Sequence, residues 1–107
     1  MTKLFQAQNP NTSQEILSVL ATDKNLYVRC GVARNPNTSP ETLQVLATDE
    51  DYVVRWAVAL NSNTSPETLS VLATDENCSV RYVVARNPNA TELIRRLVLM
   101  TNTQEEK

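Results

Sequence analysis

The chain has 107 residues, enough for one small domain, and its 10 basic and 12 acidic side chains give a formal net charge of −2. This balance disfavours general binding to nucleic-acid phosphates, which needs a clear basic excess. The sequence lacks histidine, the commonest proton shuttle and metal ligand near neutral pH, and its single glycine, Gly31, excludes a glycine-rich phosphate-binding loop.

A repeat of 26 residues organises the chain. Residues 35–49 and 61–75 differ at only two positions. Asparagine recurs in the same register, at Asn9, Asn35, Asn61 and Asn87. A fixed period of this length is typical of proteins in which stacked units share a continuous core. We therefore predict a single domain over residues 1–100 with three full units, at residues 9–34, 35–60 and 61–86.

The first predicted element is a helix over residues 2–8, which align with residues 28–34 in the first full unit. The chain therefore opens with the second half of a unit, and we interpret residues 1–8 as an N-terminal cap.

Each full unit is predicted to begin with one helix, here termed the A helix. In the unit 35–60 this helix starts at Ser39, because serine is a good N-cap and proline and glutamate, the next two residues, suit a first helical turn. Leu43 and Leu46 mark one face at helical spacing, and the helix stops near Asp49.

A valine in each A helix lies off this leucine face, at Val19, Val45 and Val71. Because one two-helix unit cannot bury its own apolar surface, we predict that these valines pack against the next unit.

The second helix of each unit, the B helix, is predicted near residues 27–34, 53–60 and 79–86. Val28 and Val32 stand four residues apart, which favours a helix over a strand, although valine is also common in strands. The sequence leaves open whether this helix is α or 3₁₀. It ends at Asn-Pro, because proline blocks continuation.

The last predicted element is a C-terminal cap helix within residues 87–100. Thr91 replaces the serine–proline start of the earlier A helices. The remaining residues, 101–107, are polar and predicted to form a flexible tail.

The consensus V-R-x-x-V-A-x-N-P-N-T-S-P-E-x-L-x-x-L-A-x-D resembles the leucine-rich repeat variant family, over roughly residues 2–100. The wider relatives are HEAT and armadillo repeats. The resemblance implies an all-α fold: a right-handed α-solenoid of about four two-helix repeats, in which short B helices alternate with longer A helices and line the concave side. One described member carries an iron–sulfur cluster on a cysteine-rich segment. The two cysteines here, Cys30 and Cys78, cannot ligate such a cluster, so no cofactor is expected.

Each unit also has an aspartate followed six residues later by an arginine: Asp23 and Arg29, Asp49 and Arg55, Asp75 and Arg81. Such arginines can pair with carboxylates of their own and the neighbouring unit. A structural ladder is the favoured interpretation, and an anion-binding row is the alternative.

Enzymatic activity is not expected. A nucleophile–base pair needs histidine or a specially activated lysine or amine, and neither is evident. The acidic residues recur in the same turn of each unit and lack calcium-loop spacing, so no metal site is predicted either.

Partner binding is the favoured function, through the B-helix positions that vary between otherwise similar units. Tyrosine, tryptophan and arginine are enriched at interface hot spots, and they recur at these positions. The predicted contact residues are Tyr27, Cys30, Arg34, Val53, Trp56, Leu60, Tyr82 and Arg86. We expect Trp56 to face solvent. Neutral drift of a packing surface is the alternative.

Self-assembly is a second hypothesis, because the run Leu97, Val98, Leu99 and Met100 is too apolar for a solvated terminal cap and predicts a homodimer. Nucleic-acid binding ranks third.

No secretory signal or membrane-spanning run is evident, and the two cysteines form no disulfide pattern, so a cytoplasmic location is expected.

Overall fold

The computed structural model describes residues 2–105 of the chain, with side chains described as far as Asn102. Over this range the backbone forms helices and no strand, which confirms the all-α prediction. The helices are α1 (Lys3–Gln8), α2 (Gln14–Leu20), α3 (Leu26–Arg34), α4 (Pro40–Leu46), α5 (Tyr52–Leu60), α6 (Pro66–Leu72), α7 (Cys78–Arg86) and α8 (Glu92–Glu105).

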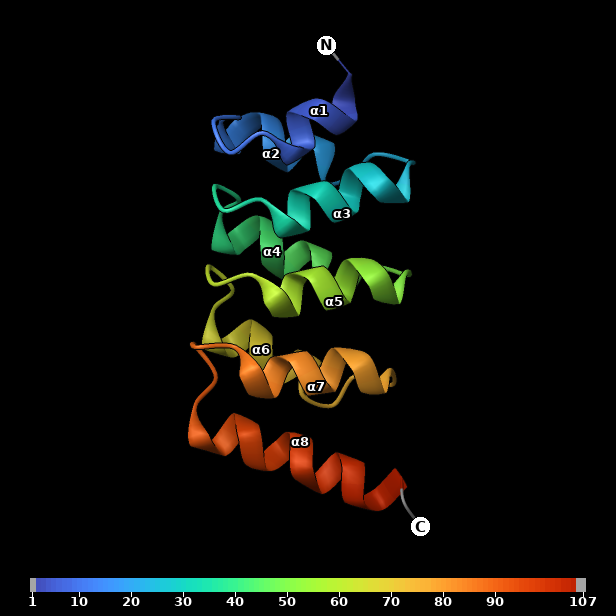
Figure 1. Cartoon of the computed structure of the whole chain (residues 1–107), viewed down its shortest axis with the longest axis vertical. Helices are drawn as coiled ribbons and strands as arrows, with labels where there is room; N and C mark the ends of the chain where they lie inside the picture. The colour runs from blue at the N-terminus through green and yellow to red at the C-terminus, as the bar shows by residue number, and fades with distance from the viewer. Residues whose placement is uncertain (1, 106–107) are drawn as a thin grey trace.

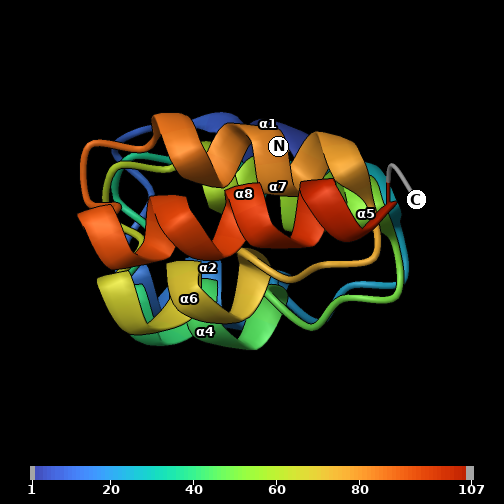
Figure 2. The ribbon, with the colours of Figure 1, turned by 90° about the horizontal axis from the view of Figure 1, so that it is seen from below.

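The helices form two layers that run along the long axis of the molecule (Figure 1). The B helices α1, α3, α5 and α7 stack on one another in one layer, and α2, α4 and α6 form the other. Figure 2 shows the two layers end-on, with α8 across the end of the stack, where it contacts both α6 and α7. The molecule measures 48 × 22 × 16 Å.

The predicted lengths of the two helix types are wrong. The B helices α3, α5 and α7 are α-helices of nine residues each, whereas the A helices α2, α4 and α6 have seven. The B helices start early because an Asx side chain caps each one, as Asn25 does by accepting from the backbone N–H of Tyr27. The A helices stop early because each ends in a three-residue turn. In α4 the backbone N–H of Asp49 donates to the carbonyl of Leu46, and α2 and α6 end in the same way.

Serine caps the A helices as the sequence predicts. The Ser39 hydroxyl accepts from the backbone N–H of Thr42, and Pro40 takes the first helical position. The core lies between the layers, where the leucines of the A helices meet the valines of the B helices. Leu43 and Val58 are both fully buried, and each such side chain contributes about 1.5–3 kcal/mol through its removal from water.

The predicted burial of Val19, Val45 and Val71 against neighbouring units is wrong, because 58–71% of each side chain is exposed. Successive B helices pack directly on one another, whereas the A helices pack mainly on the B helices. The units therefore stack through the B layer, and the outer side of the A layer stays open to solvent.

Buried asparagine amides join the units. Asn61 donates from Nδ2 to the carbonyls of Ala33 and Asn35, at 2.8 and 3.0 Å, in the turn that ends the preceding B helix. Asn35 and Asn87 make the equivalent pairs of bonds one unit earlier and one unit later. These bonds satisfy carbonyls that a helix C-terminus leaves without intrahelical partners.

The C-terminal prediction is wrong in extent, because α8 continues to Glu105 instead of ending near residue 100. Two of its side chains make contacts that resemble those between successive units. Arg95 Nε donates to the carbonyl of Ala85 at 3.0 Å, where an asparagine amide would donate in the next unit. Asn102 accepts from Arg81 Nε at 3.0 Å, where the other ladder arginines meet an aspartate. The predicted tail residues 106–107 lie outside the described residues.

Candidate functional site

The arginine ladder runs along one edge of the B layer. Arg29 donates from Nη1 to the carbonyl of Asp23 at 2.9 Å, and from Nε to the carboxylate of Asp49 in the next unit at 2.8 Å. Arg55 repeats both bonds with the Asp49 carbonyl and the Asp75 carboxylate, at 2.8 Å each. Each arginine therefore ties its own turn to the turn of the following unit.

The two ends of the ladder use different residues. Arg81 is fully buried and donates to the Asp75 carbonyl and to Asn102. At the N-terminal end, Lys3 pairs with Asp23 at 3.0 Å. The pKa of the Asp23 carboxyl is lowered, mainly by a hydrogen bond from the backbone N–H of Asn25 and next by the hydrogen bond from Lys3. Because the guanidinium groups are engaged inside the fold, this arrangement supports the structural interpretation over an anion-binding row.

The predicted contact residues lie on α3, α5 and α7, and α1 adds two residues that the sequence analysis missed. Two rows of side chains run across the B layer, and each row takes one residue from the same position of each B helix. The central row consists of Leu4, Cys30, Trp56 and Tyr82, and the arginine row of Gln8, Arg34, Leu60 and Arg86. Tyr27 and Val53 precede the central row by one helical turn. We call this surface the B-helix face.

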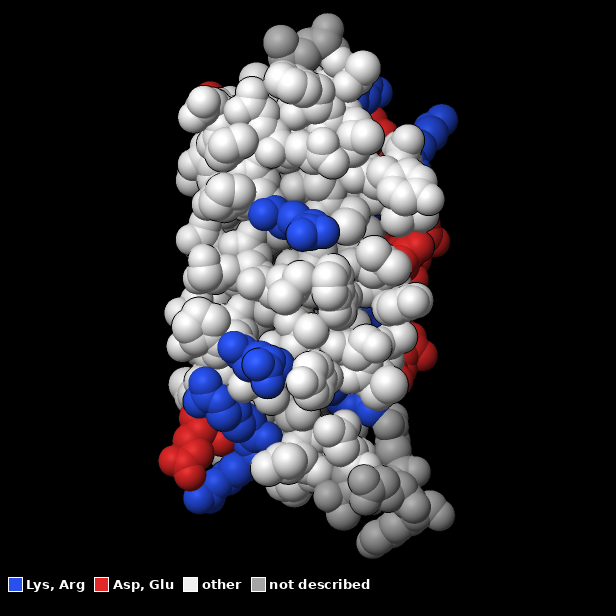
Figure 3. All heavy atoms as spheres, in the orientation of Figure 1, with Lys and Arg blue, Asp and Glu red and all other residues white. Residues whose placement is uncertain are grey.

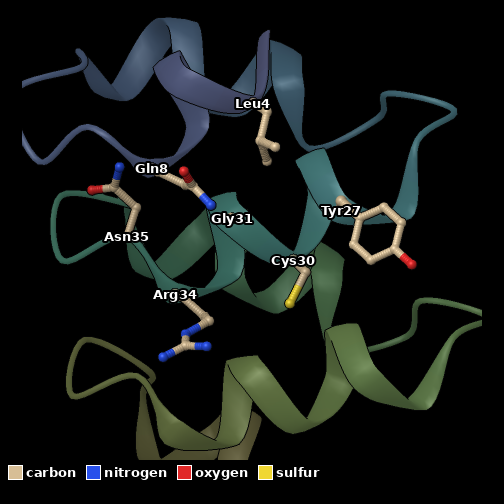
Figure 4. Close-up of a pocket in the computed structure, with 7 residues that line it drawn as sticks. All are labelled: Leu4, Gln8, Tyr27, Cys30, Gly31, Arg34 and Asn35. Atoms are coloured by element: carbon tan, nitrogen blue, oxygen red, sulfur yellow. The ribbon is translucent and has the colours of Figure 1, made fainter.

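A hollow of about 580 Å³ opens on this face between α1 and α3. Figure 4 shows its lining, in which Leu4 projects from α1 toward the side of α3 that carries Gly31 and Cys30. Gly31 permits close packing here, because a Cβ atom at this position would lie 3.0 Å from the Cβ of Ala7, a tight contact. Arg34 and Tyr27 lie on α3 at the rim.

A second hollow, of about 720 Å³, lies between α5, α7 and α8. It is lined by Trp56, by Tyr82 and its neighbours on α7, and by Asn102. A smaller hollow of about 190 Å³ lies near the C-terminal ends of α5 and α7, where Leu60 and Arg86 meet. The second and third hollows share Tyr82 and Val83 in their linings, whereas the first is distinct. Arg34 borders the first hollow and Arg86 the third.

Trp56 was predicted to face solvent, but it is half-buried and packs against the core. The indole also lines the second hollow, together with Tyr82 and Val83 of the next B helix. By contrast, Tyr27 and Tyr82 are 67% and 61% exposed. An isolated sequence could not distinguish these cases, because the packing of α7 on α5 decides how much of the indole is covered.

Charge is unevenly distributed over the B-helix face. Figure 3 shows acidic side chains along one edge and separate basic groups on the body of the face. The edge acids include Glu50, Asp51 and Glu76, at the turns that start the B helices. Within residues 2–102, Arg34 and Arg86 at the opposite helix ends take part in no ion pair, and Arg86 lies 5.6 Å from the ring centre of Tyr82.

Both cysteines are free thiols. Cys30 is half-buried in the central row, and burial raises its pKa, partly offset by the nearby charge of Arg34. Within the described part of the chain, no three metal-ligating side chains gather into a cluster. Nor does any helix there have the length and apolar character needed to cross a membrane.

Comparison with known proteins adds one finding. Residues 27–51 match the family model of the leucine rich repeat variant. These residues are therefore similar to one unit of that repeat family. The match spans α3 and α4, one B helix and the A helix that follows it, and it confirms the resemblance drawn from the consensus. No curated protein and no solved structure matched the chain.

Proposed function

We propose that this chain is a non-enzymatic protein–protein interaction module that binds its partner through the B-helix face. In this proposal the two layers are a right-handed α-solenoid of about four 26-residue repeats. A cytoplasmic location is part of this proposal, and the two free thiols support it.

The observation that carries the proposal is the coincidence of hollows with variable positions. The core position occupied by Leu17, Leu43 and Leu69 keeps the same residue in every unit. The central row changes from Cys30 to Trp56 to Tyr82 at equivalent positions, and these side chains line the hollows. Stacking restricts the first set, whereas the second set is free to match a partner.

The test is affinity capture from native lysate with the wild type and three variants, Tyr82→Ala, Trp56→Ala and the control Val71→Ala. Tyr82→Ala removes an exposed side chain of the B-helix face, and Val71→Ala removes one on the outer side of the A layer. We expect Tyr82→Ala and Trp56→Ala to lose a captured protein that the wild type and Val71→Ala retain. Circular dichroism and thermal unfolding report whether each variant stays folded, which matters most for the half-buried Trp56. Equal capture by all four folded proteins would contradict the proposal.

Self-assembly is the second candidate, favoured by apolar side chains at the free end of the stack. Leu99 and Met100 are 65% and 62% exposed, and Leu93 is 69% exposed. Val98, predicted to join this surface, is buried in the core, and Leu97 packs against the core. Light scattering at high protein concentration tests this candidate, because a strictly monomeric chain would exclude it.

Nucleic-acid binding remains the disfavoured third hypothesis, because the chain is acidic overall. Retention on heparin at moderate salt would be needed to support it.

A further inference from the structure

We infer that the B-helix face binds an extended acidic peptide segment, with two carboxylates about six residues apart and apolar side chains between them. This inference rests on the proposed function and specifies the chemistry of the partner.

Charge complementarity is the first argument. Arg34 and Arg86 are exposed and take part in no ion pair within residues 2–102. The arginines of the ladder, by contrast, are already engaged with carboxylates and carbonyls of the fold. The B-helix face therefore offers two available guanidinium groups, and guanidinium pairs well with carboxylate.

The spacing of these arginines gives the spacing of the carboxylates. Arg34 and Arg86 occupy the same position in α3 and α7, so two helix-to-helix steps separate them. Packed helices lie about 8–10 Å apart, which makes the separation roughly 16–20 Å. An extended chain rises about 3.3 Å per residue, so about six residues span it. Residues separated by an even number also project from the same side of an extended chain.

The position between the two arginines indicates which partner side chains should lie between the two carboxylates. Leu60 stands in the arginine row between Arg34 and Arg86 and is 44% exposed. The neighbouring central row offers Cys30 and Trp56 beside the two larger hollows. The two partner side chains that face this middle zone, at the second and fourth positions after the first carboxylate, should therefore be apolar.

The shape of the face favours an extended segment over a helix. The hollow between α1 and α3 shares no lining residue with the two hollows between α5 and α7, which meet at Tyr82 and Val83, so the face has no single continuous trough. An α-helix about 10 Å in diameter needs one continuous trough. An extended segment instead places alternate side chains into separate depressions while its backbone crosses the intervening helices.

The direct test uses a labelled peptide of sequence S-D-S-L-S-L-S-D-S at low ionic strength. Fluorescence anisotropy measures its binding, and the fluorescence of Trp56, the only tryptophan, reports contact with the face. We expect at least about tenfold tighter binding than for a peptide with lysine at both aspartate positions, and weaker binding as salt rises. A peptide with both aspartates adjacent at one end should bind less tightly.

Charge reversal on the protein provides the matched control. The double variant Arg34→Glu with Arg86→Glu should lose the acidic peptide and prefer the lysine peptide. The double variant Arg34→Gln with Arg86→Gln should bind neither peptide well. It replaces the charge-reversed variant in the test if that variant does not fold. Arg96→Glu changes an exposed arginine on α8 that pairs with Glu92, so it should bind like the wild type.

Unchanged acidic-peptide binding in the double variants, absence of binding to the folded wild type, or preference for a single-stranded oligonucleotide would overturn this inference. The capture experiment distinguishes a failure of this inference from a failure of the proposed function. If lysate capture is lost in Tyr82→Ala but kept in the double arginine variants, the B-helix face is a binding surface and only the acidic peptide is wrong.

Discussion

At the scale of single residues, the repeated asparagine does more than end a helix. The sequence predicts that a B helix ends at Asn-Pro, and α3 and α7 confirm it. The bonds from the amide to the previous unit were not predicted, because the acceptors of Asn61 are backbone carbonyls 26 and 28 residues earlier in the chain. Every residue has a backbone carbonyl, so the sequence does not indicate which carbonyl accepts from Asn61. Only the packed structure reveals this contact.

These amide bonds predict a position-dependent cost for the same substitution. Asn61→Ala should lower the free energy of unfolding by about 1–3 kcal/mol, because the buried Ala33 carbonyl loses its donor and the Asn35 carbonyl keeps only the N–H of Thr38. Asn9→Ala removes the same residue from the first turn, where the side chain accepts from the N–H of Asn11 but its amide donates to no described residue. We expect a change within about 0.5 kcal/mol there. Urea denaturation measures both, and equal losses would refute a role for the amide bonds.

The ladder gives a second prediction at this scale. Arg55→Ala should destabilise the chain by about 3 kcal/mol, because the Asp75 side chain is only 8% exposed and would lose its cation. The matched control is Lys3→Ala, whose ammonium side chain is 68% exposed, and we expect less than about 1 kcal/mol. Thermal unfolding is the measurement. An Arg55→Ala variant with unchanged melting temperature but lost ligand binding would support the anion-binding alternative instead.

At the scale of elements, the A and B helices could be located from sequence but their lengths could not. The serine–proline starts and leucine spacing placed α4 and α6 correctly, since both signals are local. The length of each B helix depends on where an Asx side chain such as Asn25 caps its start. The length of each A helix depends on where a three-residue turn ends it, as happens after Val45. The burial of Val45 was mispredicted because stacking occurs through the B layer, which no single helix reveals.

The predicted role of α8 as a C-terminal cap yields a third testable prediction. Arg95→Ala should cost about 1 kcal/mol, because the Ala85 carbonyl loses its donor and the end of α7 is left open. Arg96→Ala, one residue further, should change stability by no more than about 0.5 kcal/mol, because its pair with Glu92 is exposed. Chemical denaturation distinguishes the two. A larger loss for Arg96 would mean that the cap does not work through this bond.

At the scale of the whole molecule, stacking produces one face that is free to vary. The period of 26 residues was enough to predict that Cys30, Trp56 and Tyr82 occupy equivalent positions, and the structure places them around hollows on one layer. The contribution of α1, through Leu4 and Gln8, was not predicted, because it depends on how the half unit packs on α3. The partial burial of Trp56 has the same origin, in the contact between successive B helices.

The most direct test of the central claim is hydroxyl-radical footprinting of the chain with and without its captured partner. We predict that Tyr27, Trp56 and Tyr82 become protected in the complex, because they lie on the B-helix face. Ile16 and Val45, exposed on α2 and α4, should be labelled equally in both states. Protection of Ile16 and Val45 with unchanged labelling of the three aromatic residues would contradict the account.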